Sequence, residues 1–84
     1  MSRKDKLLAR LRAAPKDFTW EEAVSLMGMH NFSELNATRG SGKKFVHTVT
    51  RVKVILHKPH PGNILKGYVV QALLDGLKNS GEID

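Results

Sequence analysis

The 84-residue sequence contains no cysteine, so it can form neither a disulfide framework nor a cysteine-ligated metal site. It also lacks any apolar run close to the roughly 20 residues that a membrane-spanning helix needs. The segment 1–16 has too many charges and too short an apolar stretch for a signal peptide. We therefore expect a small soluble domain that functions in the cytoplasm.

Acidic residues are absent from the middle of the chain. Between Leu35 and Leu74 there is no Asp or Glu, although this stretch carries many lysines, arginines and histidines. A segment with charge of one sign repels itself unless it contacts a polyanion. Together with the net charge of +6, this pattern favours a nucleic-acid partner. Solvated lysines on a small basic protein would give the same composition.

Two helices are expected in the first 30 residues. Ser2 can cap the first helix, which Pro15 stops. Thr19 and Glu22 have the spacing of a capping box at the start of the second helix, and Gly28 is placed to end it. The large apolar residues around this second helix are interpreted as core residues: Phe18, Trp20 and Met27.

A change to a period of two after residue 31 predicts three strands, at residues 32–38, 43–49 and 51–58. An amphipathic helix follows, with its apolar residues on one side: Val69, Val70, Leu73, Leu74 and Leu77. The predicted fold is α+β, a three-stranded antiparallel sheet with helices on one face. We expect a single domain over 1–84, in which 1–15 is a helical extension of a core at 19–78.

The alternation also predicts which residues lie on the sheet face that the helices leave uncovered. Phe45 and Val49 are expected in the core, as are the apolar residues of the third strand: Val52, Val54 and Leu56. The uncovered face is then expected to carry position 42, Lys44, Val46, Thr48, Arg51, Lys53, Ile55 and His57. A turn at residues 49–50 places Gly42 opposite His57. Val-Thr is not a favoured tight turn, and a slip of two residues would change these partners while keeping the faces.

Histidine and lysine on that face have the chemistry for metal-independent RNA cleavage, which needs proton transfer and a cation at the phosphate. His57 with Lys44 and Lys53 is a minimal set. His47 lies on the side of Phe45 and is interpreted as a partly buried, hydrogen-bonded residue. His30 is interpreted as a loop residue. No metal or other cofactor is expected, because His57 and His60 lack a third ligand in their half of the chain.

The Gly40-Ser41 turn, the segment "PHPGNILK" at 59–66 and the closing helix resemble HicA-type toxins. The resemblance covers Thr19 to Leu77. It implies a small mRNA interferase with a double-stranded-RNA-binding-domain-like fold, neutralised by a HicB antitoxin. The family motif reads Gly-Ser-His, and its histidine carries the RNA chemistry. The third residue here is Gly42, so we take His57 across the predicted hairpin as the candidate replacement.

The resulting hypothesis is a toxin-like endoribonuclease that cleaves single-stranded mRNA. The candidate catalytic residues are His57 and His60, and the candidate RNA-binding residues are Gly40, Ser41, Gly42, Lys43, Lys44, Lys53, Lys58 and Lys66. Exposed apolar residues such as Ile55 and Val46 suggest that an antitoxin with acidic and apolar groups would cover the same face. Two alternatives stay open: a catalytically silent RNA-binding domain, and a domain whose basic face meets only an acidic protein.

Overall fold

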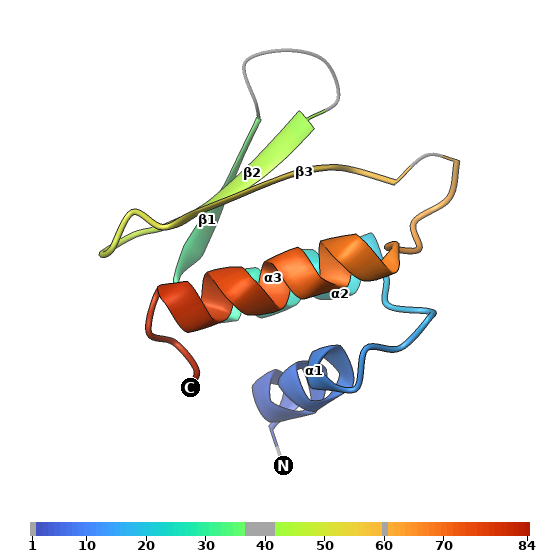
Figure 1. Ribbon diagram of the computed structural model, residues 1–84, viewed down its shortest axis with the longest axis horizontal. Helices are drawn as coiled ribbons and strands as arrows, with labels where there is room; N and C mark the ends of the chain where they lie inside the picture. The colour runs from blue at the N-terminus through green and yellow to red at the C-terminus, as the bar shows by residue number, and fades with distance from the viewer. Residues whose placement is uncertain (1, 37–41, 60) are drawn as a thin grey trace.

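Two helices precede a three-stranded sheet and one helix follows it. The computed structural model describes residues 2–36, 42–59 and 61–84. The elements are α1 (Arg3–Arg12), α2 (Trp20–Met29), β1 (Phe32–Asn36), β2 (Gly42–His47), β3 (Lys53–His57) and α3 (Gly67–Asn79) (Figure 1). The strands form one antiparallel sheet in the order β1-β2-β3. The predicted α+β fold is confirmed. Within the described residues, no helix is both long and apolar enough to cross a membrane.

The starts of the first two helices follow their predicted caps, whereas the end of α2 does not. Ser2 Oγ accepts a hydrogen bond from the Asp5 N–H (3.1 Å), and Thr19 forms the expected capping box. The prediction that Gly28 ends α2 is wrong, because the helix continues through this residue to Met29. The chain instead leaves the helix at Asn31, whose φ of 67° is a left-handed conformation that asparagine tolerates.

The end of α3 folds the C-terminal tail back toward the helix. Gly81 has a φ of 82°, and its N–H donates to the Lys78 carbonyl (3.0 Å). The N–H of Glu82 donates to the Leu77 carbonyl (3.0 Å), which completes a Schellman motif. The tail is therefore held against the end of α3, and the side chain of Glu82 points to the interior.

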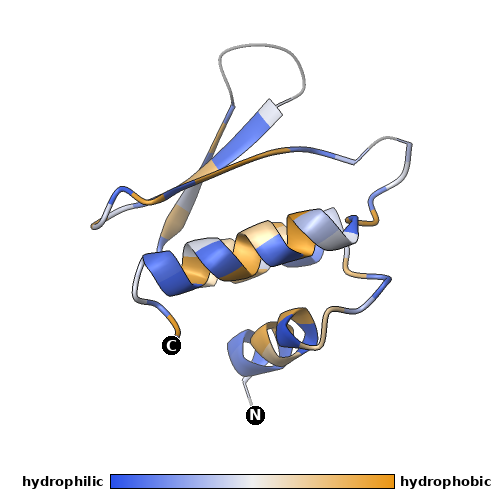
Figure 2. Cartoon of the chain, in the orientation of Figure 1, coloured by the Kyte–Doolittle hydropathy of each residue, from blue (hydrophilic) through white to orange (hydrophobic). Residues whose placement is uncertain are grey.

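The helices form two layers on one side of the sheet. Helix α2 lies against β1 and α3 against β3, and α1 packs on both of these helices from the far side (Figure 1). Figure 2 shows the apolar residues of the strands and helices that enclose the core. The largest fully buried side chains come from every layer: Leu11, Phe18, Leu26, Met27, Phe45, Val70, Leu73 and Leu77. Among the described residues, nothing covers the other face of the sheet.

Helix α3 approaches β3 closely at one glycine. A Cβ atom at Gly76 would overlap the Cγ2 methyl of Val54, so the position requires the absence of a side chain. Gly76 and Val54 are both buried in the core. This contact sets how closely the helix can lie to the strand.

The predicted register of the β2–β3 hairpin is confirmed, although its turn is built differently from the prediction. Gly42 pairs with His57 and Lys44 with Ile55. The connection spans residues 48–51, where Arg51 has a φ of 67° and its N–H donates to the His47 carbonyl (3.1 Å). The expectation that Val49 lies in the core is wrong: its side chain is 79% exposed, because it sits at the turn and not in the strand.

Candidate nucleic-acid interface

The uncovered side of the sheet carries cations and apolar groups together. Strand pairing places Ser33 opposite Val46 and Leu35 opposite Lys44 in β1 and β2, and Val46 opposite Lys53 in β2 and β3. Since alternate residues share a face, this side consists of Ser33, Leu35, Gly42, Lys44, Val46, Lys53, Ile55 and His57. We call this set the open face. It contains no acidic residue.

One end of the open face holds a glycine directly opposite a histidine. Gly42 begins β2 and His57 ends β3, and the two are Cα partners in the ladder. The His57 side chain is exposed. Gly42 places no side chain opposite the imidazole, but the glycine itself is buried, so a phosphate would reach the imidazole from its exposed side. The predicted juxtaposition is therefore present. Gly40, Ser41 and His60 lie outside the described residues.

Two of the predicted RNA-binding lysines join this histidine on the open face. Lys44 lies diagonally across the ladder from His57, a separation of about 7–8 Å between Cα atoms that a lysine side chain can span. Lys44 is partly exposed and Lys53 is exposed. Lys53 lies four residues from His57 along β3, which is about 13 Å for extended backbone. The face thus presents cations along its length.

The other predicted lysines lie elsewhere. Lys43 points to the helix side of the sheet, where its Nζ donates to Asn36 Oδ1. Lys58 is exposed beyond the end of β3. Lys66 is the N-cap residue of α3, beside a groove of about 570 Å³ that Pro15 and Lys16 also line. The structure therefore brings Lys44, Lys53 and His57 together on the open face, whereas Lys43 and Lys66 lie elsewhere and Lys58 directly follows His57 beyond the end of the strand.

The apolar residues of the open face are unequally exposed. Leu35 and Ile55 are 47% and 68% exposed, whereas Val46 is only 9% exposed. The expectation that Val46 is an exposed contact is therefore wrong: it occupies the central strand, between Ser33 and Lys53. Leu35 and Ile55 flank Lys44 on the two edge strands. This mixture of apolar surface and cations suits a ligand with both flat apolar groups and anionic groups, as nucleic acids have.

Comparison of the chain with protein-family models, curated proteins and solved structures gives no match. The resemblance to HicA-type toxins stays a prediction. The charge and geometry of the open face are the features that favour a nucleic-acid ligand.

A second polar cluster lies inside the fold, at the opposite end of β2 from Gly42. His30 Nδ1 is 3.1 Å from Glu82 Oε1, and His47 Nε2 is 2.9 Å from Glu82 Oε2. Asn31 Nδ2 also donates to Oε2 (3.3 Å). His30 follows the end of α2 in a turn, as expected, but its side chain is buried, and the interpretation of His47 as a buried, hydrogen-bonded residue is confirmed. Glu82 thus joins the ends of α2, β2 and α3.

The hydrogen bonds of His47 define which ring nitrogen carries the proton. Its Nδ1 accepts from the backbone N–H groups of Val49 (3.2 Å) and Thr50 (3.1 Å). The proton is therefore on Nε2, which donates to Glu82. These hydrogen bonds from His47, and then from His30 and Asn31, lower the pKa of Glu82 from 4.5 to about 2. The Val49-Thr50 turn lacks the residues that favour a tight turn, and the His47 imidazole stabilises it by accepting hydrogen bonds from both backbone N–H groups.

The cluster of His30, Asn31, His47 and Glu82 is interpreted as structural. Its two imidazoles are buried, and among the described residues no group of three or more acidic or histidine side chains is arranged to hold a metal ion. His30 Nε2 has no hydrogen-bond partner within the described part of the chain. We assign the cluster to stabilising the hairpin turn and the C-terminal tail.

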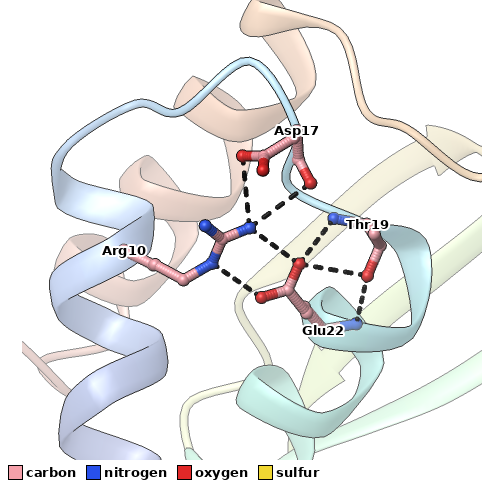
Figure 3. Close-up of polar contacts among 4 residues, drawn as sticks. All are labelled: Arg10, Asp17, Thr19 and Glu22. Atoms are coloured by element: carbon pink, nitrogen blue, oxygen red, sulfur yellow. Dashed lines mark hydrogen bonds and ion pairs between the residues drawn. The ribbon is translucent and has the colours of Figure 1, made fainter.

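The N-terminal helix is attached to the domain by a separate ion pair. Arg10 Nε is 2.7 Å from Glu22 Oε2, and Arg10 also contacts Asp17 (3.4 Å) (Figure 3). Glu22 Oε1 accepts from the Thr19 N–H (3.0 Å) within the capping box. The hydrogen bond from Arg10 lowers the pKa of Glu22, and the same bond raises the pKa of Arg10. Because Leu7 and Leu11 are buried as well, α1 packs on the domain.

Sequence reasoning missed the buried contacts of Glu82 and the left-handed turn conformation of Arg51. Gly81 after an amphipathic helix is a signal for a Schellman end, and this predicts that the tail turns back. It does not predict which side chains the tail then meets. The 48–51 connection contains neither glycine nor asparagine, the residues that tolerate a left-handed conformation best. This absence was the signal that another residue in the connection, here Arg51, would adopt that conformation.

Proposed function

We propose that the open face binds single-stranded RNA and that the chain is a metal-independent endoribonuclease of the cytoplasm, similar to HicA-type mRNA interferases. The observation that carries this proposal is the pairing of Gly42 with exposed His57, beside Lys44 on a face without acidic residues. Gly42 itself is buried, so the phosphate would lie over the exposed His57 imidazole, within reach of the Lys44 ammonium group.

In the proposed reaction, the His57 imidazole accepts the proton of a ribose 2′-hydroxyl. The 2′ oxygen attacks the adjacent phosphorus, the new O2′–P bond forms and the P–O5′ bond breaks. Lys44 stabilises the negative charge that develops on the phosphoryl oxygens. The departing 5′ oxygen takes a proton from an acid. His60, the second predicted catalytic residue, is our candidate for this acid. The reaction requires no cofactor.

We further propose that a HicB-type antitoxin inhibits the enzyme by covering the open face. Leu35 and Ile55 are exposed beside Lys44, so an inhibitor with apolar and acidic side chains would complement this surface. Addition of the antitoxin should then abolish RNA binding and RNA cleavage together. Inhibition of cleavage with unchanged RNA binding would contradict a shared face.

The central experiment measures cleavage and binding of a fluorescently labelled single-stranded RNA in the presence of a chelator. The wild type should cleave, and His57→Ala should cleave at least about 100-fold more slowly with its RNA affinity largely retained. Lys78→Ala, an exposed lysine in the last turn of α3, is the control and should leave cleavage unchanged. Equal cleavage by wild type and His57→Ala would refute the catalytic assignment.

The second candidate function is a catalytically silent RNA-binding domain. It is favoured by Gly42 itself, since the position at which the resembled family has its histidine carries no side chain here. Binding that weakens with salt, without any cleavage by the wild type, would establish this alternative. Absence of any salt-dependent binding would reject RNA as the ligand and leave the acidic-protein partner.

A further inference from the structure

The open face has a groove at the end that is remote from Gly42 and His57. The groove has a volume of about 240 Å³, and its lining residues are Ser33, Leu35, Val46, His47, Thr48 and Arg51. Val46 lies four residues along β2 from Gly42, about 13 Å in extended backbone. The groove and the Gly42–His57 pair are therefore separate places on one surface that an extended strand of RNA can cross.

The groove has an apolar floor and a polar rim. Val46, 9% exposed, forms the floor in the central strand, and Leu35, 47% exposed, forms a wall on β1. Ser33, Thr48 and Arg51 also line the groove, and their side chains carry hydroxyl and guanidinium groups. The volume is below the roughly 300–1,000 Å³ of pockets for drug-sized molecules, so a single flat heterocycle is a suitable occupant.

Arg51 is held in an unfavourable backbone conformation. Its φ of 67° lies in the left-handed region, where a residue with a Cβ is destabilised and glycine or asparagine is preferred. The hydrogen bond from its N–H to the His47 carbonyl uses only the backbone, so glycine would make it equally well. The turn therefore does not need an arginine side chain. Strained residues of this kind are concentrated at functional sites.

The charge on Arg51 is also not used within the fold. Its side chain is exposed, and among the described residues it forms neither a hydrogen bond nor an ion pair through its guanidinium. A guanidinium has only donors, arranged in a planar fork that matches two neighbouring acceptors. Guanine presents two such acceptors, O6 and N7, whereas the same edge of adenine has one acceptor and one donor.

We propose that this groove binds one unstacked guanine of the single-stranded RNA substrate. Leu35 and Val46 contact the face of the base, and the Arg51 guanidinium donates to O6 and N7. The groove would thereby select where on the RNA the strand is cut, because it lies at a fixed distance from His57. This inference rests on the proposed function, since it assumes that the open face binds RNA.

The test compares the wild type, three Arg51 variants and one control variant in binding to short labelled RNAs that contain either one guanine or adenine in its place. Arg51→Gly removes the side chain and relieves the backbone, Arg51→Ala removes the side chain alone, and Arg51→Lys keeps the charge without the fork. Wild type should favour the guanine RNA about tenfold. All three variants should lose this preference, and Arg51→Gly should melt at or above the wild-type temperature. Arg12→Ala, which removes an exposed charge on α1, should keep the preference.

The outcomes separate this proposal from the one on which it rests. Wild type that binds both RNAs equally, or favours adenine, refutes the guanine site while leaving RNA binding by the open face intact. A preference that persists in Arg51→Gly also refutes it. Wild type that binds neither RNA at low salt refutes the proposed function instead. A map of cleavage sites for wild type and Arg51→Gly adds a second readout: cleavage should continue in the variant but lose its fixed position relative to guanine.

Discussion

Replacement of Glu82 by glutamine should destabilise the fold in a pH-dependent way. The carboxylate accepts hydrogen bonds from two buried histidines and is itself only 18% exposed. Its pKa is lowered from 4.5 to about 2, first by the hydrogen bond from His47. A lowering of this size corresponds to at most about 3–4 kcal/mol of folding free energy. Because solvent screens a partly exposed carboxylate, we expect Glu82→Gln to cost about 2 kcal/mol at pH 7.

The sign of the pH dependence follows from the direction of this change. A carboxyl group with a lower pKa in the folded state stabilises the fold fully above its unfolded pKa, here about 4.5. The stabilisation is lost as the pH falls from there toward 2. The wild type should therefore lose about 2 kcal/mol from this group over that range, whereas Glu82→Gln has no such carboxyl group to titrate. The free energies of unfolding of the two proteins should converge in acid.

Urea denaturation at pH 7, 5 and 3 measures this difference. With a slope of about 1 kcal/mol per M for a small domain, the variant's midpoint at pH 7 should be lower by about 2 M. Glu34→Gln is the control: it removes an exposed carboxylate of β1 and should change the free energy by less than about 0.5 kcal/mol. If Glu82→Gln is as stable as wild type at pH 7, or if the gap is the same at pH 3, the assignment of Glu82 is wrong.

Two further predictions concern the packing and the capping of the helices. Gly76→Ala should lower the free energy of unfolding by about 1–3 kcal/mol in thermal melts, because its methyl overlaps Val54. Gly28→Ala is its matched control, since this helical position has open space and should gain up to about 1 kcal/mol; equal effects would refute the packing argument. Thr19→Ala should cost about 0.5–2 kcal/mol by removing the cap of α2, and an unchanged midpoint in urea would contradict the role of the capping box.

The parts of the fold that the sequence predicted are those with a strong local pattern. The capping box at Thr19 and the stripe from Val69 to Leu77 depend on neighbours within one helix, and both are present as expected. The end of α2 depends on a choice between Gly28 and Asn31 that the local pattern does not decide. In the structure Asn31 takes the left-handed conformation after α2, and its side chain donates to the Glu82 carboxylate of the C-terminal tail.

The candidate site was predictable where strand parity decides it. Parity placed Lys44, Lys53 and His57 on one face, and the pairing of Gly42 with His57 followed from the turn. Parity fails at turns, which is why Val49 is exposed although it continues the pattern of Phe45. Strand parity also does not predict how much neighbouring side chains cover a residue in the central strand. The burial of Val46 therefore could not be predicted from parity.

Acidic residues lie elsewhere in the fold, so the cations of the open face have no acidic neighbours on that face. Three acidic residues of the helical layers and of the tail have partners there: Glu22 with Arg10, Glu21 with Asn63, and Glu82 with His30 and His47. The open face has cations without acidic partners, exposed leucine and isoleucine, and at its hairpin end an arginine in a left-handed conformation. Each of these features lowers the stability of the free domain through repulsion, exposed apolar area or backbone strain. A polyanion with flat bases would relieve the repulsion and cover the apolar area. Binding would then add stability by mass action, so the residues that destabilise the free fold are those expected to contact the RNA.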